Sequence, residues 1–374
     1  MTRQRGYSLI EFMVASALGL LVLLGISRVF VAAQVGYGLS QAKSTMQDNA
    51  RLASESIQRD LRMAGYMGCV NDGARFRTTE VYVHLPGGTS TSTFSGVNFA
   101  DNFARGIEGF EASGTAPGNT YSLPTGATGG TWSPALPAAL RGVVAPGSDV
   151  LVVRYLGPAR ARISAFTPNA AGARVTIDTT VLNRVEANKT YALTDCNQVS
   201  FFSAGSVSNG GASFVATGVG GIENYSTTTG YVYETTTVAY YVGREPSGRM
   251  GLFRYPISRT STAPTEALVP GVMSLQALYA WDSKAPLPDG AVDTEGTAQA
   301  MDAARVNGAE VHQRIGQARV SLLMAENGPR RSDTDPNRSR SMLGTTVTPP
   351  PTDGDRLTTV YDLAGAPRNH LFGY

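Results

Sequence analysis

The hydrophobic pattern opens with an apolar segment that contains a single acid. Tyr7–Ser27 is 21 residues long, and Glu11 is its only charge. A helix of this length spans about 31 Å, the thickness of the hydrocarbon core of a bilayer. The segment is therefore predicted to be a transmembrane helix. A carboxylate costs roughly 2–3 kcal/mol near the middle of a bilayer, so Glu11 is expected to have a functional partner.

Helical periodicity continues beyond this segment while the polarity rises. From Ser40 to Ala64 apolar residues recur at intervals of three, four or seven, which predicts one buried face. These residues are Ala42, Met46, Ala53, Ile57, Leu61 and Ala64. Gly65 follows as a typical terminator. The pattern predicts one helix over Tyr7–Ala64, divided into a membrane segment of residues 7–33 and an amphipathic continuation of residues 34–65.

The rest of the chain, residues 66–374, is predicted to be rich in β-strands. The expected strands are Glu80–Leu85, Asp149–Leu156, Arg174–Ile177, Val199–Ser203, Thr236–Val242, Leu252–Tyr255, Ser274–Ala280 and Arg319–Met324. The run Gly243–Gly248 predicts a hairpin between two of them. Pro86–Gly147 and Asn327–Asp355 are predicted to be long irregular insertions. The expected fold class is α+β, with a long N-terminal helix packed on an antiparallel, sheet-rich globular domain.

The small residue of the leader stands before the apolar run, whereas a secretory signal has its cleavage site after the run. The two arginines in residues 1–6 place the N-terminus in the cytoplasm. Cleavage after Gly6 would leave the helix on the mature protein and free the α-amine of Tyr7, which is cationic below a pKa of about 8. Glu11 of one copy could neutralise the Tyr7 amine of another. The alternative is an uncleaved anchor in which Glu11 is incidental.

The run Gly6–Glu11 reads Gly-Tyr-Ser-Leu-Ile-Glu and resembles the processing site of type IV prepilins, usually Gly-Phe-Thr/Ser-Leu-Ile/Val-Glu. The resemblance implies a pilin-like fold, cleavage between Gly6 and Tyr7 by an inner-membrane prepilin peptidase, and N-methylation of Tyr7. It also implies that Glu11 guides docking into the filament. Major pilins commonly have a proline about twenty residues into the mature helix. This chain lacks it and has Arg28 nearby, which favours a minor pilin.

Later segments resemble the PilW family of minor pilins. They are Asp60–Cys69, Val238–Val242, Leu268–Val272, Arg319–Leu323 and Pro367–Asn369. The resemblance implies incorporation at or near the pilus tip, where the protein primes assembly and supports twitching motility and adhesion. The implied partners are other minor pilins, the major pilin, the prepilin peptidase and the inner-membrane assembly platform. The implied location is the inner membrane before assembly, with the domain facing the periplasm, and the cell-surface pilus afterwards.

Cys69 and Cys196 are the only cysteines. In an oxidising compartment an even number favours a disulfide, worth roughly 2–4 kcal/mol. Two separate buried thiols are the alternative.

No pattern of side chains predicts catalysis, a cofactor or a metal. The three histidines are not spaced as metal ligands usually are: His84, His312 and His370. Each is predicted to be either exposed to solvent or hydrogen-bonded within the fold. No nucleophile elbow supports a Ser-His-Asp triad. The loop acids Asp282, Asp289 and Asp293 lack the pattern of a calcium-binding loop and are predicted to be solvated.

The charge pattern also argues against nucleic acid. The net charge is +2, which gives no general attraction to a polyanion. A local basic cluster comprises Arg330, Arg331, Arg338 and Arg340. It has no interleaved aromatic residues on which bases could stack.

Three other functions remain open from the sequence. A minor pseudopilin of a type II secretion system would share the leader and Glu11, and neighbouring genes would distinguish it. A tip adhesin or DNA-uptake pilin would use the insertions as a binding surface. A membrane-anchored enzyme is the most distant alternative.

Overall fold

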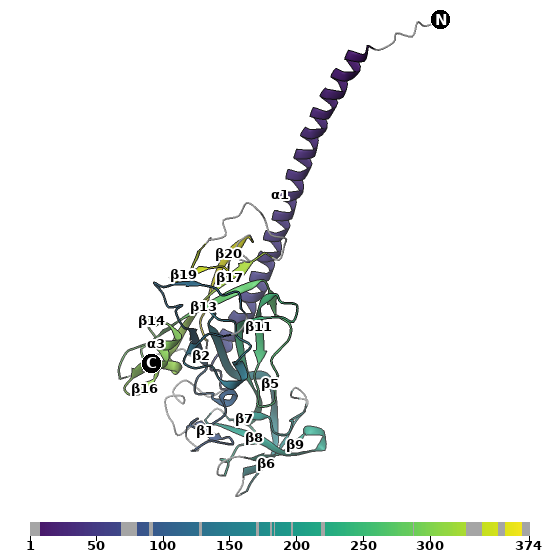
Figure 1. Ribbon diagram of the computed structural model, residues 1–374. Helices are drawn as coiled ribbons and strands as arrows, with labels where there is room; N and C mark the ends of the chain where they lie inside the picture. The colour runs from purple at the N-terminus through teal and green to yellow at the C-terminus, as the bar shows by residue number, and fades with distance from the viewer. Residues whose placement is uncertain are drawn as a thin grey trace.

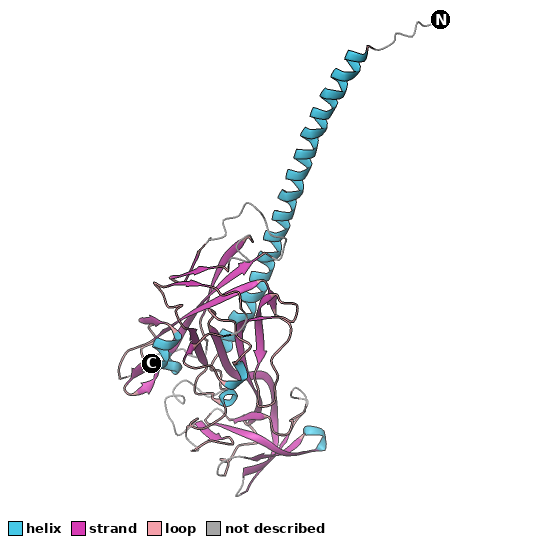
Figure 2. Cartoon of the chain, viewed as in Figure 1, coloured by secondary structure: helices cyan, strands magenta, loops and turns pink. Residues whose placement is uncertain are grey.

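The computed structural model shows a long helix that projects from a β-rich head (Figures 1 and 2). It describes residues 8–68, 81–89, 93–126, 129–169, 172–179, 182, 184–195, 197–217, 221–286, 288–326, 339–350 and 356–368. The α+β, pilin-like class expected from the pattern is confirmed.

Helix α1 spans Leu9–Met63, close to the predicted range. Glu11 lies in its first turn and Arg62 in its last, and both charges complement the helix dipole. Gly65 has a φ of +68°, a left-handed conformation that glycine adopts without a steric penalty, so the chain turns there as predicted.

Within the residues that the structure describes, twenty strands follow α1, and each of the eight predicted runs overlaps one of them. The strands are β1 Val81–His84, β2 Ile107–Ala112, β3 Thr120–Ser122, β4 Trp132–Ser133, β5 Val150–Asn169, β6 Gly172–Ile177, β7 Thr190–Thr194, β8 Val199–Ser208, β9 Ser213–Thr217, β10 Tyr231–Arg244, β11 Met250–Pro256, β12 Val269–Pro270, β13 Val272–Trp281, β14 Thr294–Gly296, β15 Arg305–Val306, β16 Ala309–Glu310, β17 Ile315–Ala325, β18 Arg340–Met342, β19 Thr345–Thr348 and β20 Thr358–Gly365. The short helices are α3 Ala298–Ala303, η1 Phe99–Asp101, η2 Ala138–Leu140, η3 Asn209–Gly211 and η4 Val311–Arg314.

The second half of α1 packs into a core between two sheets. The larger sheet contains β2, β5, β10 and β11, and the smaller has the order β14-β13-β17-β20. Ala53, Ile57 and Leu61 of α1 are completely buried against strands of both sheets. The predicted buried face of the helix is thus confirmed, apart from Ala42, which is only half-buried.

Six strands of the larger sheet close into a barrel at the end of the head opposite α1 (Figure 1). Around the ring the order is β5-β6-β9-β8-β7-β10, and every neighbouring pair is antiparallel. The ring closes because Tyr231–Tyr233 of β10 pairs with β5 on one side and with β7 on the other. Phe202 and Phe214 stack inside it, with ring centroids 5.6 Å apart. We call residues 157–234 the barrel.

The strands β5 and β10 continue from the barrel into the rest of the head. Leu151–Leu156 of β5 pairs with Thr235–Tyr240 of β10 beyond the barrel, beside the buried face of α1. We call α1, β2, β11, β13, β17, β20 and these parts of β5 and β10 the scaffold.

The two predicted insertions are only partly irregular. Within 86–147, β2 is a buried strand paired with β5, and within 327–355 the strands β18 and β19 pair with each other. The pattern missed β2 because Gly109 and two acids interrupt its apolar run. Tyr279 packs against the backbone of Gly109, where a side chain would collide with its ring.

Candidate functional site

Helix α1 begins with a polar cap that involves Glu11. Ser8 is the N-cap residue, and its backbone N–H donates a hydrogen bond to Glu11 Oε2 at 3.0 Å. Glu11 therefore satisfies an amide that has no partner within the helix. The side chain is exposed and forms no ion pair with the residues that the structure describes. Gly6 and Tyr7, the predicted processing site, lie outside the described residues.

From Leu9 to Tyr37 the apolar side chains of α1 are free of the head on every side (Figure 1). Leu9 is 79 % exposed and Tyr37 is 74 % exposed. Within the described parts of the chain, α1 is the one helix long and apolar enough to cross a membrane. Apolar surface on this scale is covered by lipid or by other protein in the working state. This part of α1 is the first component of the candidate site.

Asp60 is the polar anchor that joins α1 to the larger sheet. It is 2 % exposed and receives hydrogen bonds from three strands. Tyr155 Oη donates to Oδ1 at 2.9 Å, and Tyr240 Oη donates to Oδ2 at 2.6 Å. Arg254 donates from Nε to Oδ2 at 2.9 Å and from Nη2 to Oδ1 at 3.3 Å. These bonds replace the water that a buried carboxylate loses, so Asp60 fixes α1 in one position on the sheet.

The partners of Asp60 titrate abnormally because of this contact. Burial raises the pKa of Tyr155 and Tyr240, and the adjacent Asp60 carboxylate raises both further. Burial alone would lower the pKa of Arg254, but its hydrogen bonds to Asp60 outweigh that effect and raise it. Both hydroxyls and the guanidinium therefore remain protonated across the physiological range.

The C-terminal part of the chain returns to the last turns of α1. Gln58 Nε2 donates to the carbonyl of Ala364 at 3.3 Å, and the backbone N–H of Arg368 donates to the carbonyl of Arg62 at 3.2 Å. The second bond satisfies a carbonyl in the last turn of the helix. The closing Pro-Arg-Asn element thus caps α1, although Asn369 lies outside the described residues.

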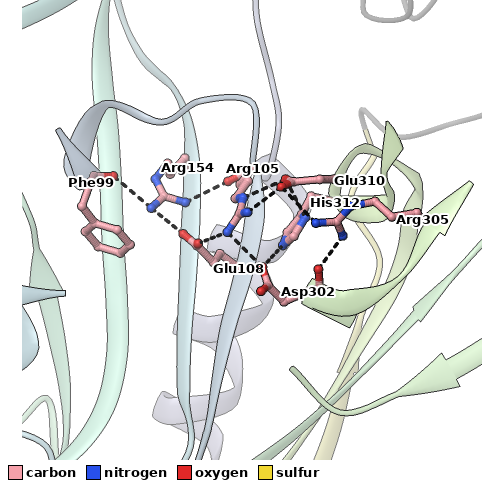
Figure 3. A network of polar contacts seen from close by, with 8 residues as sticks. All are labelled: Phe99, Arg105, Glu108, Arg154, Asp302, Arg305, Glu310 and His312. Atoms are coloured by element: carbon pink, nitrogen blue, oxygen red, sulfur yellow. Dashed lines mark hydrogen bonds and ion pairs between the residues drawn. The ribbon is translucent and has the colours of Figure 1, made fainter. Parts of the chain in front are cut away.

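A second buried network holds the segment around α3 and η4 against β2 and β5 (Figure 3). Arg154 is completely buried and donates to Glu108 Oε2 at 2.7 Å and to the carbonyl of Phe99 at 3.0 Å. Arg105 binds Glu108 at 2.7 Å and both oxygens of Glu310 at 2.8 and 3.0 Å. Burial alone would raise the pKa of Glu108, but the charges of Arg154 and Arg105 lower it overall.

The described histidines lie beside carboxylates. His84 is buried, with Nε2 2.9 Å from Glu223 Oε2, and is a satisfied histidine as predicted. His312 is 1 % exposed, with Nδ1 3.4 Å from Glu310 Oε2. His370 lies outside the described residues. Within the described ranges, no group of three or more His, Cys, Asp or Glu side chains could hold a metal ion.

The prediction that the loop acids are solvated is wrong for Asp282. This side chain is completely buried and accepts hydrogen bonds from the backbone N–H groups of Lys284, Asp289 and Gly290. It folds the loop around itself, so its role is structural. Asp289 and Asp293 are exposed as predicted, and Asp289 is paired with Lys284.

The basic cluster and the two cysteines lie largely outside the described residues. Of the four arginines only Arg340 is described, and it donates to the carbonyl of Thr358. Cys69 and Cys196 are both outside the described ranges. Gly68, the residue before Cys69, packs against Thr194, which is two residues before Cys196. A Cβ on Gly68 would lie 2.7 Å from Thr194 Cγ2.

Two protein families match the chain. The prokaryotic N-terminal methylation motif matches residues 1–27. The family described as type IV pilus-assembly protein W, PilW, matches residues 239–367. Over these two regions the chain is similar to PilW-like minor pilins of the type IV pilus. No curated protein and no solved structure matches it.

The two family matches cover the start of the helix and the C-terminal part of the head. The methylation motif covers the cap and the first half of the exposed apolar surface. The PilW match begins at Ala239 in β10, just after that strand leaves the barrel, and extends through β20. The barrel lies outside both matches.

The sequence pattern did not identify Asp60 as a site residue, although it contained a signal. Asp60 is three residues after Ile57 and four before Ala64, so helical spacing places it on the apolar face. A charge on a buried face requires a partner. The partners themselves come from β5, β10 and β11, and no spacing along the chain connects them to the helix.

Proposed function

We propose that this protein is a minor pilin, which is stored in the inner membrane and then enters a type IV pilus at or near its tip. Residues 1–6 are the cytoplasmic leader, which the prepilin peptidase removes between Gly6 and Tyr7. Tyr7 becomes N-methylated. Residues 7–33 form the membrane and filament-core helix, residues 34–65 its amphipathic continuation, and residues 66–374 the domain outside the inner membrane.

The observation that carries this proposal is the contrast between the two halves of α1. The apolar side chains from Leu9 to Tyr37 are exposed, whereas Asp60 and its neighbours are fixed in the head. Such a helix can exchange lipid for other helices without any change in the head. Force transmitted along α1 would reach three strands through the hydrogen bonds of Asp60.

Assembly, and not turnover, is the proposed mechanism. Glu11 already accepts the Ser8 amide and has lone pairs left for a cation of another subunit, which supports its role in registration. The proposed partners are other minor pilins, the major pilin, the prepilin peptidase and the assembly platform. Once at the tip, the protein would prime filament growth and support twitching motility and adhesion. The PilW match supports a pilus over a type II secretion system.

The first test is substitution of Glu11 in the native host. Glu11→Ala or Glu11→Val is expected to reduce recovery of the protein in sheared pili while membrane insertion stays intact. Glu55→Ala is the matched control, because Glu55 is an exposed acid on the same helix whose partner is Arg51 of its own chain. Normal recovery of both Glu11 variants would refute the registration role.

The second test is the mature N-terminus determined by mass spectrometry. N-methyl-Tyr7 is the expected first residue. A chain that still begins with its initiator methionine in every fraction would exclude processing after Gly6.

A tip adhesin is the second candidate, and the barrel favours it. The barrel lies outside both family matches and at the end of the head farthest from the membrane helix (Figure 1). Fab fragments against the barrel are expected to block attachment without changing piliation. Fab fragments that bind the barrel and leave attachment unchanged would exclude this role.

A further inference from the structure

Arg28 is an isolated cation on the exposed apolar part of α1. Between Leu9 and Ala42 the only charged residues are Glu11 and Arg28. Ile26, Val29 and Phe30 around it are 61 %, 70 % and 61 % exposed. Arg28 is itself exposed and makes no hydrogen bond or ion pair with the described residues.

The membrane and the filament place different demands on this side chain. In the stored form Arg28 directly follows Ser27, the last residue of the 21-residue apolar run, and its long side chain can reach the lipid headgroups. In a filament the apolar side chains around it become covered by other helices. A guanidinium covered in this way needs an acceptor, since an unpaired buried charge is strongly unfavourable.

We propose that Arg28 binds the carboxylate in the first helical turn of a neighbouring pilin. This inference rests on the proposed function, because it applies to the assembled filament. The carboxylate is the residue that corresponds to Glu11, the only acid in the first 47 residues of this chain. The prepilin motif places the same residue type at that position in other pilins, so such an acid is available on helices that can pack here.

The helix geometry then fixes the stagger between the two subunits. Arg28 follows Glu11 by 17 residues, which corresponds to about 25 Å along a helix. For parallel helices, the partner is therefore displaced by about 25 Å toward the head, in the direction of the tip.

The same spacing separates the two charges around the helix. At about 100° per residue, 17 residues bring Arg28 to roughly 100° from Glu11. The two charges consequently face different neighbours. Arg28 contacts a subunit nearer the tip, and Glu11 remains available to a subunit nearer the membrane.

Photo-crosslinking in intact pili tests the contact. p-Benzoyl-phenylalanine replaces Ala32, which lies one turn above Arg28 on nearly the same face, and the adducts are mapped by mass spectrometry. The expected adduct joins position 32 to the N-terminal peptide of another pilin. The matched control replaces Phe30, which points to the opposite side, and is expected not to capture that peptide. Adducts from position 32 confined to mid-helix or head peptides would overturn the proposal.

Charge variants provide the second measurement. Arg28→Lys is expected to keep recovery in sheared pili within about twofold of wild type, whereas Arg28→Glu reduces it at least about tenfold through repulsion between two acids. Wild-type recovery of Arg28→Glu would refute the pairing. Absence of the wild-type protein from pili would instead refute the proposed function.

Discussion

The scaffold and the barrel bury different kinds of side chain. The scaffold encloses charges such as Asp60, Glu108 and Arg154, each paired with partners from distant parts of the chain. The barrel core is built from aliphatic and aromatic side chains, among them Tyr191 and Phe202. Its strands are joined in part by hairpins, including β7–β8 and β8–β9, so many of its contacts are local.

This difference corresponds to what each region must do. The scaffold holds the helix that we propose carries the load of assembly, and directional polar contacts permit only one docking position. The barrel has only to remain folded. Apolar packing stabilises its fold without directional contacts between particular pairs of residues. Both family matches fall on the scaffold, which supports the view that assembly constrains this part of the molecule.

The largest effect is expected from removal of the anchor in the scaffold. Asp60→Ala leaves Arg254 and two buried hydroxyls without their acceptor, and should lower the free energy of unfolding by about 3–5 kcal/mol. Urea unfolding of the detergent-solubilised protein, followed by tryptophan fluorescence, measures this. Both tryptophans, Trp132 and Trp281, lie outside the barrel. Asp48→Ala, an exposed acid on the same helix, is the control. Equal effects of the two substitutions would contradict the anchor.

A cavity in the barrel core should have a large but local effect. Phe202→Ala removes a stacked ring that is completely buried and should destabilise the barrel by about 3–4 kcal/mol. Hydrogen exchange should show loss of protection in β6–β9. The tryptophan transition of the scaffold should move less than it does for Asp60→Ala. Equal shifts for both variants would show that the two regions unfold as one unit.

Two carboxylates, Asp149 in the scaffold and Glu223 in the barrel, are expected to contribute to stability with opposite pH dependence. Burial raises the pKa of Asp149 in the scaffold to about 7, although its carboxylate accepts hydrogen bonds from Ala112 of β2 and Ala277 of β13. The folded state thus favours the neutral acid, and the unfolded chain ionises near pH 4. The contribution of Asp149 to scaffold stability is therefore greatest below pH 4 and falls by roughly 3–4 kcal/mol as the pH rises to 7.

Glu223 in the barrel has the opposite sign. Burial alone would raise its pKa, but hydrogen bonds from His84 and Ser200 lower it overall. Its contribution to the stability of the folded state is present above about pH 4.5 and is lost as the pH falls through its lowered pKa. The tryptophan transition of Asp149→Asn and the exchange of barrel amides in Glu223→Gln, each compared with wild type from pH 3 to 7, check both trends. A pH dependence of stability that the substitution leaves unchanged would contradict the contribution of that carboxylate.

The smallest effect is expected from the exposed pair on α1. Arg51 Nε lies 2.7 Å from Glu55 Oε1, and both side chains are largely in solvent. Such a pair adds little to the free energy of unfolding because water screens the attraction between the two charges. Glu55→Ala should leave both the tryptophan transition and barrel exchange unchanged. A measurable loss in either would show that this pair also contributes to docking of the helix.

The sequence determined the elements that depend on local spacing. The 3.6-residue period predicted α1 and its buried face through Ile57 and Leu61, and Gly65 predicted its end. Alternating apolar runs predicted eight strands. The motif at Gly6–Glu11 and the later segments predicted the PilW resemblance, which the family matches confirm. Processing at Gly6 and Tyr7, the role of Glu11 and a bridge between Cys69 and Cys196 remain predictions.

Only the tertiary structure decided which distant residues meet. The barrel closes because one stretch of β10 pairs with both β5 and β7. The sequence around Tyr231 does not predict that this strand pairs with two others. Asp60 is visible in the sequence as a charge on an apolar face, but its acceptor role depends on Tyr155, Tyr240 and Arg254, up to 194 residues away. Local spacing specifies a helix or strand because neighbouring residues share its geometry. Docking and closure are set by chain segments that meet only in the folded state.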